Sequence, residues 1–341
     1  MMSWRLGDKF GHQLLLELSK TLISDQRYVE DDHEGFTWWA NDLAQRVWCE
    51  EGIYQHATTT YRMHCETDLI RGRGRATAFE LALEREMDHT TLNALVYDAP
   101  NDTYKLHSSV FATEENIVHL KRTAFSAVIL QIVEAQMVAQ KLVSSLGAIP
   151  ASSAHPTMGI RTQADNMCHA METFFKPQGA QQSRWHGAPE WADTERAVER
   201  ESEKFTSDHH THLQAEFIWS ASQSSRGIVL DVTTREPHPI LGNGLHFTLS
   251  VPLVMSPERV SHMALELNQY ERDNWKRTHM LGSWSCHGGV LAYRSFVPNT
   301  VYRAELLPEL TLNNAVRAHW VNEFFVEKRR QAEAAKSAGQ I

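Results

Sequence analysis

The sequence is poor in cysteine, has no excess of basic side chains and lacks an apolar run long enough to cross a bilayer. Its 341 residues include four cysteines, which are widely spaced and form no C-x-x-C pair: Cys49, Cys65, Cys168 and Cys286. This usage is typical of reduced thiols buried one by one, and it excludes a disulfide-stapled miniprotein. Asp8 and Lys9 stand where a signal peptide needs its apolar core, so we expect a cytoplasmic protein.

Basic charge is scarce, because 33 Lys and Arg face 42 Asp and Glu and the formal net charge is −9. Residues 1–150 hold 14 basic and 21 acidic side chains and so carry −7 of this charge. The one dense basic run, residues 71–75, is too short to form the clustered positive surface that nucleic acid requires. Gly72 and Gly74 within it lack the third glycine of a dinucleotide loop. We therefore predict no nucleic-acid partner.

The most apolar stretch, residues 124–138, is interrupted by Gln131, Glu134 and Gln136. It is also shorter than the roughly 20 residues that a membrane-spanning helix needs, so we predict no membrane span. A helix over this stretch is apolar around most of its circumference and should be buried on two sides. It is expected either at a seam between two halves of the chain or in a homodimer contact.

Bulky apolar side chains are plentiful, with 10 Trp and 13 Phe, and at about 150 residues per domain the length predicts two domains. Leucines at helical spacing predict a first helix over residues 9–24. Residues 61–70 alternate between apolar and polar as in a half-buried strand, with His64 and Glu66 on the polar side. A helix over residues 76–87, a hairpin over 93–111 and a long helix over 113–146 complete this half.

Small residues and two prolines mark residues 147–156 as the best domain boundary. Beyond it the order of elements recurs. The second half is expected to contain a helix around 164–175, a charged helix over 192–205 and strands over 214–220, 227–233 and 245–251. A helix opened by Ser256 and Pro257, a hairpin across Gly288-Gly289 and a last helix over 305–327 complete it.

We therefore predict an α+β protein of two similar domains, each an antiparallel sheet packed by helices in the order helix, three strands, helix, two strands, helix. The domains cover residues 1–148 and 162–330, with a linker over 149–161 and a charged tail over 331–341. The hairpin strands 104–110 and 291–297 are also alike locally. Recurrence of the whole element order favours an internal repeat of a domain of about 150 residues.

This element order resembles that of bacterial type III secretion chaperones and the similarly folded YbjN-type proteins. The second half carries the resemblance best. Residues 257–275 resemble the middle helix, with Asn268 near its end, residues 283–297 the hairpin, and residues 306–325 the closing helix. The resemblance implies a non-enzymatic protein that binds another polypeptide, with its two copies packed as an intramolecular version of the family's dimer.

The densest polar cluster is Asp208-His209-His210-Thr211-His212. Imidazole nitrogen and carboxylate oxygen are common zinc ligands, and His210 and His212 share one side of an entering strand. Neighbouring side chains diverge, however, so His209 points elsewhere and the cluster is more typical of a solvated loop. We predict no metal and no cofactor, and we keep a metal-dependent hydrolase that uses these histidines as the third hypothesis.

Trp38 and Trp39 are the candidate partner contact, because one of two neighbours in a strand must face away from the core. The alternative is that the linker or the other domain shelters the second indole. We predict a non-enzymatic protein-binding protein, chaperone-like or regulatory, of the bacterial cytoplasm. The second hypothesis is a helix-grip binder of a small apolar ligand, which needs six or seven strands where we count five per domain.

Overall fold

The computed structural model describes residues 10–55, 58–72, 83, 87, 91–169, 182–221, 226–274 and 278–337. The helix expected over residues 76–87 lies outside this part of the chain except for Leu83 and Met87, which are both buried. The helix expected around residues 164–175 is described only as one turn, over residues 166–169.

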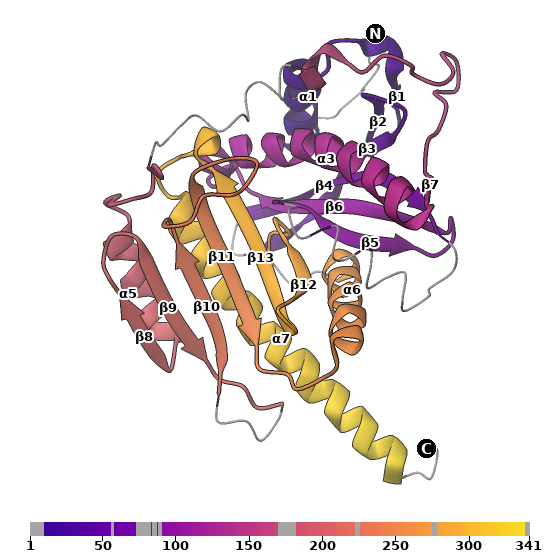
Figure 1. Cartoon of the computed structure of the whole chain (residues 1–341). Coiled ribbons are helices and arrows are strands. Elements are labelled where there is room, and N and C mark those ends of the chain that lie inside the picture. The colour runs from indigo at the N-terminus through magenta and orange to yellow at the C-terminus, as the bar shows by residue number, and fades with distance from the viewer. Residues whose placement is uncertain are drawn as a thin grey trace.

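The first half of the chain holds two long helices and one sheet (Figure 1). In chain order its elements are α1 (Phe10–Leu22), the 3-10 turn η1 (Gln26–Tyr28), β1 (Val29–Asp31), β2 (Gly35–Trp39), β3 (Ala44–Gln55), β4 (Thr58–Arg71), β5 (Ala94–Asp98), β6 (Thr103–Ala112), α3 (Ile117–Leu146) and β7 (Ile149–Pro150).

The second half holds a second, separate sheet. Its elements are α5 (Trp191–Glu201), β8 (Lys204–Ser207), β9 (His212–Phe217), β10 (Ile228–Thr233), β11 (Gly244–Val251), α6 (Pro257–Asp273), β12 (Ser283–His287), β13 (Val290–Pro298), the 3-10 turn η2 (Asn299–Val301) and α7 (Leu306–Ser337).

The two sheets have the same strand order. The first runs β1-β2-β3-β4-β6-β5, with β7 beside β4, and the second, read from its first strand, runs β8-β9-β10-β11-β13-β12. Every pair is antiparallel. The predicted α+β class with two similar domains is confirmed.

Each sheet also has one strand more before its middle helix than we expected, β1 in the first and β8 in the second. In the second sheet the charged helix α5 ends at Glu201, because Ser202 is extended (φ −106°, ψ 153°). Residues 204–207 then pair with β9 instead of continuing the helix.

Each sheet is packed by helices of its own domain. In the first domain α1 and α3 pack on β3, β4 and β6, and in the second α6 and α7 pack on the second sheet, with α5 against α7. α3 is the one described helix that is long and apolar enough by composition to cross a membrane, but 56% of that window is buried inside the protein. A core helix of a globular domain passes the same test. Gly147, in the left-handed conformation (φ 61°), ends it.

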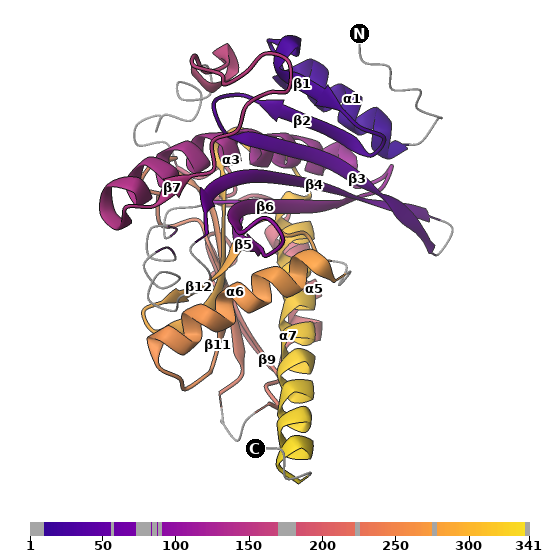
Figure 2. The same ribbon diagram turned by 90° about the vertical axis from the view of Figure 1, so that its right-hand side faces the viewer.

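The predicted linker follows the first domain closely. Pro150 pairs with Ile70 of β4, and the Ala151 amide donates to the Leu69 carbonyl at 3.2 Å. At the other end of the chain the last helix extends through Ser337, so most of the expected charged tail is helical. Figure 2 shows α6 of the second domain lying below the first sheet, next to β5.

Candidate functional site at the seam between the domains

The polar side of β4 faces the second domain. The alternation of this strand predicted a half-buried strand, yet Arg62, His64 and Glu66 are only 1%, 1% and 6% exposed. The reason is tertiary, because the C-terminal end of α6 covers this side while α3 covers the other. Buried polar side chains therefore lie on both sides of β4, and this seam is the candidate functional site.

Arg62 joins the two domains at the end of α6. Its guanidinium donates to the Arg272 carbonyl at 3.0 Å and to the Glu271 carbonyl at 2.8 Å. These are among the last carbonyls of the helix, which have no partners within it and carry partial negative charge. A buried cation from a strand of one domain therefore caps a helix of the other.

Glu66 lies at the centre of an ionic cluster. Its carboxylate accepts from the side chain of Arg272, from His107 Nδ1 at 3.1 Å and lies 3.7 Å from Lys105 Nζ. Burial alone would raise the pKa of Glu66, but the contacts with His107 and Arg272 hold it below its usual value. Burial lowers the pKa of His107, so the cluster contains an ionised glutamate and a neutral imidazole.

The charges of this cluster are paired with one another. Its carboxylate and cations neutralise one another, and the neighbouring thiol of Cys65 projects to the other face of the strand, where it donates to Gln131 Oε1 at 3.0 Å. Burial raises the pKa of Cys65 well above its ordinary value, and that of Cys49 likewise, so neither thiol is a nucleophile.

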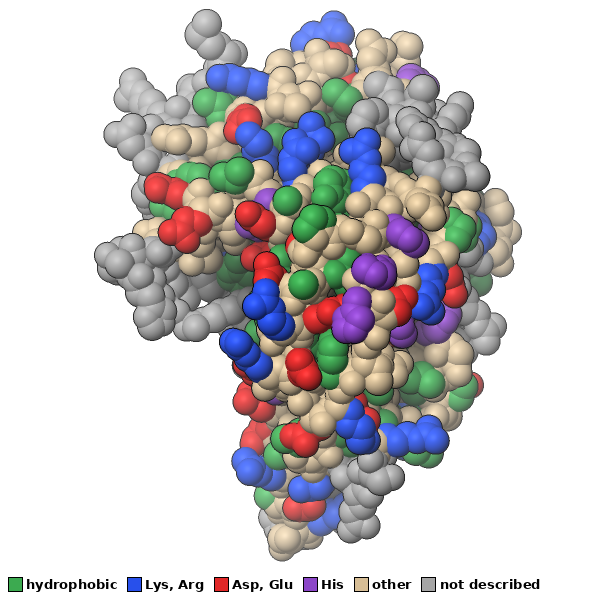
Figure 3. Space-filling model, turned by 90° about the vertical axis from the view of Figure 1, so that its left-hand side faces the viewer, with side chains coloured by type: hydrophobic (Ala, Val, Ile, Leu, Met, Phe, Trp, Pro, Cys, Tyr) green, Lys and Arg blue, Asp and Glu red, His purple; other side chains and the backbone are tan. Residues whose placement is uncertain are grey.

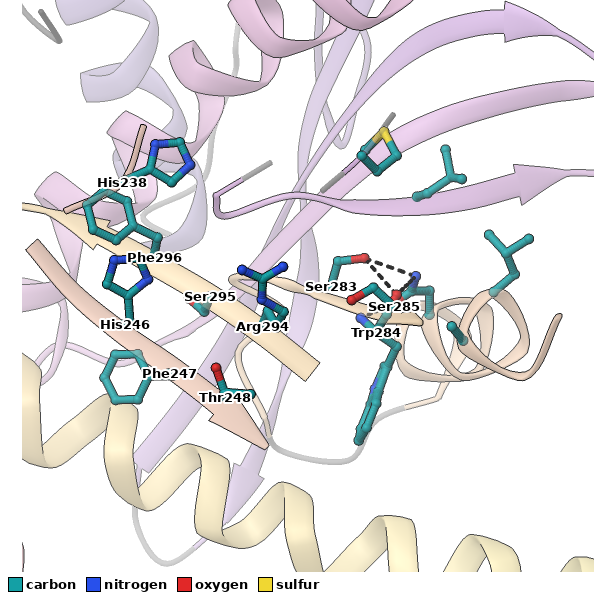
Figure 4. Close-up of a pocket in the computed structure, with 15 residues that line it drawn as sticks. His238, His246, Phe247, Thr248, Ser283, Trp284, Ser285, Arg294, Ser295 and Phe296 are labelled. Carbon is teal, nitrogen blue, oxygen red and sulfur yellow. Dashed lines mark hydrogen bonds between the residues drawn. The ribbon is translucent and has the colours of Figure 1, made fainter. Parts of the chain in front are cut away.

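A small cavity lies at the seam between β11, β12, β13 and α6 (Figure 4). It is lined by polar side chains of the second domain, among them Thr248, Ser283 and Arg294, and closed by Met87 and Leu95 of the first. Its volume of about 40 Å³ is enough for a water molecule and too small for a metabolite.

A second, apolar groove of about 120 Å³ lies between α3 and the connection from β10 to β11. Its walls are Leu130, Val133, Met137, Val138, Ile240 and Leu241, and Thr91, Glu134, Lys141 and His238 complete the lining. Glu134 is one of the polar residues that interrupt the apolar stretch in the sequence, and the structure places it on the groove.

The connection that forms one wall of this groove is a five-residue loop that occurs twice. His-Pro-Ile-Leu-Gly at 238–242 and His-Pro-Thr-Met-Gly at 155–159 have the same geometry. In each, the histidine Nδ1 accepts two backbone N–H groups at 3.2 Å, and the closing glycine has φ near +70° (72° at Gly242, 74° at Gly159). We did not predict these two loops from the sequence, although both contain the same H-P-x-x-G pattern.

The two tryptophans at which we expected a partner contact are both buried. Trp38 is 0% exposed and lies in the core. Trp39 is 6% exposed, donates from Nε1 to Ser153 Oγ at 3.0 Å and packs edge-on against the ring of His155. The linker thus shelters the second indole, as the alternative interpretation required, and a partner would have to displace the linker to touch it.

The histidines near residue 210 do not converge. His209 Nδ1 pairs with Glu195 at 2.8 Å, and His212 Nε2 pairs with Asp231 at 2.8 Å. Asp208 accepts backbone amides of His210 and His212 and so closes a turn. Figure 3 shows histidines and carboxylates gathered on the side of the molecule that includes β8 and β9. Within the described ranges no three His, Cys, Asp or Glu side chains are arranged to hold a metal ion.

Gly288 and Gly289 form the tight turn between β12 and β13, with positive φ at both, as the hairpin prediction requires. Of the basic run, Arg71 ends β4, and residues 73–75 lie outside the described part of the chain.

Comparison with protein-family models, with curated proteins and with solved structures finds no significant match to this chain. The functional interpretation below therefore rests on the residues and the fold.

Proposed function

We propose that this chain is a non-enzymatic protein-binding protein, chaperone-like or regulatory, that works in the bacterial cytoplasm. The observation that carries the proposal is a difference between two equivalent sheet faces. In the first sheet the row Arg46, Glu66, His107 crosses β3, β4 and β6, and its central members are buried under α6. The corresponding row of the second sheet is open at one end.

That row is Gln214, Asp231, Thr248 and Arg294, which are direct partners on β9, β10, β11 and β13. Gln214 is exposed and Asp231 is half-buried, and these two form the open end of the row. Thr248 and Arg294 are half-buried and line the seam cavity that Met87 and Leu95 of the first domain close. Figure 1 shows this sheet face without a helix across it, since α7 runs behind the sheet. A polar sheet face beside the free edge of β8 is a surface on which a partner polypeptide can add a strand or a helix.

The seam supports the other half of the proposal. Two domains with one strand order, joined by buried ion pairs and by a strand cation that caps a helix, correspond to the intramolecular dimer that the resemblance to secretion chaperones implies. The covered face then serves the pairing of domains, and the open face remains for the partner.

Site-specific photo-crosslinking tests this proposal. A benzophenone amino acid replaces Gln214 on the open face, and in a matched variant it replaces Gln13, which is exposed on α1. After irradiation in the native cytoplasm, the Gln214 variant should give a reproducible adduct with one polypeptide, and the Gln13 variant should not. Equal adducts from both positions, or none from either, would overturn the proposal.

A binder of a small apolar ligand is the second candidate, and the strand count now favours it more than we expected, since the second sheet has six strands and not five. Against it, the space between α3 and the first sheet holds Gln131, which bonds to Gln45, Thr67 and Asn93. Native mass spectrometry distinguishes the candidates, because a co-purified lipid favours the binder and its absence favours the protein partner.

A further inference from the structure

The groove between α3 and the 238–242 loop contains a carboxylate without a cation. Glu134 Oε1 accepts from the amide and the hydroxyl of Thr91 at 3.1 and 2.7 Å, and Oε2 accepts from Asn93 Nδ2 at 2.7 Å. Among the described residues no Lys, Arg or His lies within ion-pair distance of Glu134. Three neutral donors hold the group in place, and no cation among the described residues balances its negative charge.

The walls around this carboxylate are hydrocarbon. Leu130, Val133 and Met137 come from the helix, and Ile240 and Leu241 come from the loop. Met137 and Ile240 are 49% and 41% exposed, which is high for large apolar side chains that border a groove. The other titratable groups of the lining are Lys141, seven residues and so about 10 Å farther along the helix axis, and His238, whose Nδ1 is engaged by its own loop.

We propose that this groove binds the side chain of a lysine from the partner polypeptide, with its aliphatic stem against the apolar walls and its ammonium on Glu134. Lysine commonly packs its four-carbon stem along apolar surface and keeps its ammonium at the polar end of that surface. The acidity of the first 150 residues, −7 of the net −9, also favours a basic partner segment. The inference rests on the proposed function in that the lysine belongs to a partner.

The hydrogen bonds of Glu134 select ammonium over guanidinium. A carboxylate offers about four lone-pair positions. Two on Oε1 and one on Oε2 are occupied, so only one position, on Oε2, is open to a ligand. An ammonium can donate a single bond as a compact charge, whereas a guanidinium binds best with two parallel bonds to both oxygens. Lysine therefore fits this site better than arginine.

Protonation of Glu134 supplies an independent readout. Burial raises the pKa of Glu134 to about 7, and the bonds from Asn93 and Thr91 only partly oppose this. An ammonium binds the ionised carboxylate, so its affinity should increase as pH rises through about 7. A neutral apolar molecule should show no such increase.

The test uses n-hexylammonium, n-hexylguanidinium and n-hexanol as probes on the full chain, with binding followed by amide chemical shifts of Thr91 and Ile240. At pH 8 we expect n-hexylammonium to bind at least tenfold more tightly than n-hexanol and more tightly than n-hexylguanidinium. The preference for the ammonium should vanish in Glu134→Gln and should decrease in the wild type at pH 6.

Ile240→Ala is the matched variant, because it removes an exposed wall residue and leaves Glu134 unchanged. It should weaken n-hexylammonium and n-hexanol by the same factor. Equal binding of the three probes, or shifts away from the groove, would overturn the lysine site. If the crosslinked partner binds equally well to Glu134→Gln, the groove is not used and the proposed function stands. If the ammonium binds and no partner is found, the groove stands and the function fails.

Discussion

The imidazole of His64 stacks flat on the indole of Trp48, with ring centroids 4.7 Å apart and an interplanar angle of 5°. Arg46 also lies over the indole, with its guanidinium carbon 5.0 Å from a ring centroid. His64 Nε2 is 3.2 Å from Glu50 Oε1. His64 lies on the buried polar side of β4 together with Arg62 and Glu66, so a charge on His64 would be placed inside the seam.

Burial lowers the pKa of His64 to about 3, despite the contact with Glu50. The unfolded chain takes up this proton near pH 6.5 and the folded chain does not, so the folded state loses stability as pH falls from 6.5 toward 3. For His64 alone the loss between pH 6.5 and 5 is about 1.5 kcal/mol. Urea unfolding at both pH values measures it.

His64→Gln removes this titration and should decrease the acid-dependent loss by that amount relative to the wild type. The comparison between variants is needed because Glu134, with its raised pKa, gains stability as pH falls and opposes the effect. His33→Gln is the matched control, since the His33 side chain is 89% exposed, and it should change the free energy of unfolding at pH 6.5 by less than about 0.5 kcal/mol. A His64 variant with the wild-type profile would contradict the prediction.

The fold class and most of the described helices and strands were predictable because they depend on periodicity and turn residues along the chain, although β1 and β8 were missed. The alternation over residues 61–70 correctly predicted a strand, and Gly288-Gly289 correctly predicted a hairpin turn. What covers the polar side of β4 was not predictable, because the covering residues Glu271 and Arg272 are about 210 positions away in sequence. Short-range patterns contain no information on such contacts.

The candidate site was predictable only in part. Trp38 and Trp39 were identified as a pair, but the burial of Trp39 depends on the linker, where Ser153 accepts a hydrogen bond from its indole. Glu134 was identified as an interruption of an apolar stretch. The hydrogen bonds that fix its carboxylate come from Thr91 and Asn93, just before β5, about 40 positions earlier in the sequence. The repeated H-P-x-x-G loops were present in the sequence and could have been found by a search for short internal repeats.

Arg272→Met should separate the domains. Loss of the guanidinium leaves Glu66, 6% exposed, without its closest cation, and breaking a buried pair in this way costs about 3 kcal/mol. Because Glu66 is in the first domain and Arg272 in the second, urea unfolding should change from one transition to two.

Arg196→Met is its control. The ion pair of Arg196 with Asp193 is 70% and 74% exposed, so the free energy of unfolding should change by less than about 1 kcal/mol. A single unshifted transition in Arg272→Met would show that the cluster around Glu66 does not hold the seam.

His238→Ala should destabilise the 238–242 loop. The amides of Ile240 and Leu241 lose the Nδ1 acceptor, which costs about 1–2 kcal/mol, and the ring no longer stacks on Phe296 at 4.8 Å. His238→Asn should retain most of the loop, because the Asn side-chain oxygen can accept the same amides. Hydrogen exchange of the two amides checks this, with rapid exchange in the Ala variant and slow exchange in the Asn variant. Equal exchange in both would contradict it.

Gln131→Leu should be strongly destabilising although it makes α3 more apolar. Gln131 is 0% exposed, and its amide bonds to Thr67 at 2.8 Å and to Asn93 at 3.0 Å. Leucine has nearly the same volume, but it leaves the hydroxyl proton of Thr67 without its acceptor and the side-chain oxygen of Asn93 without its donor. Each unsatisfied group costs about 1–3 kcal/mol. Gln140→Leu, on the exposed side of the same helix, should change the free energy of unfolding by about 0.5 kcal/mol or less. Thermal unfolding of both variants decides the point, because similar shifts in Tm would mean that the polar network in the core contributes nothing to stability.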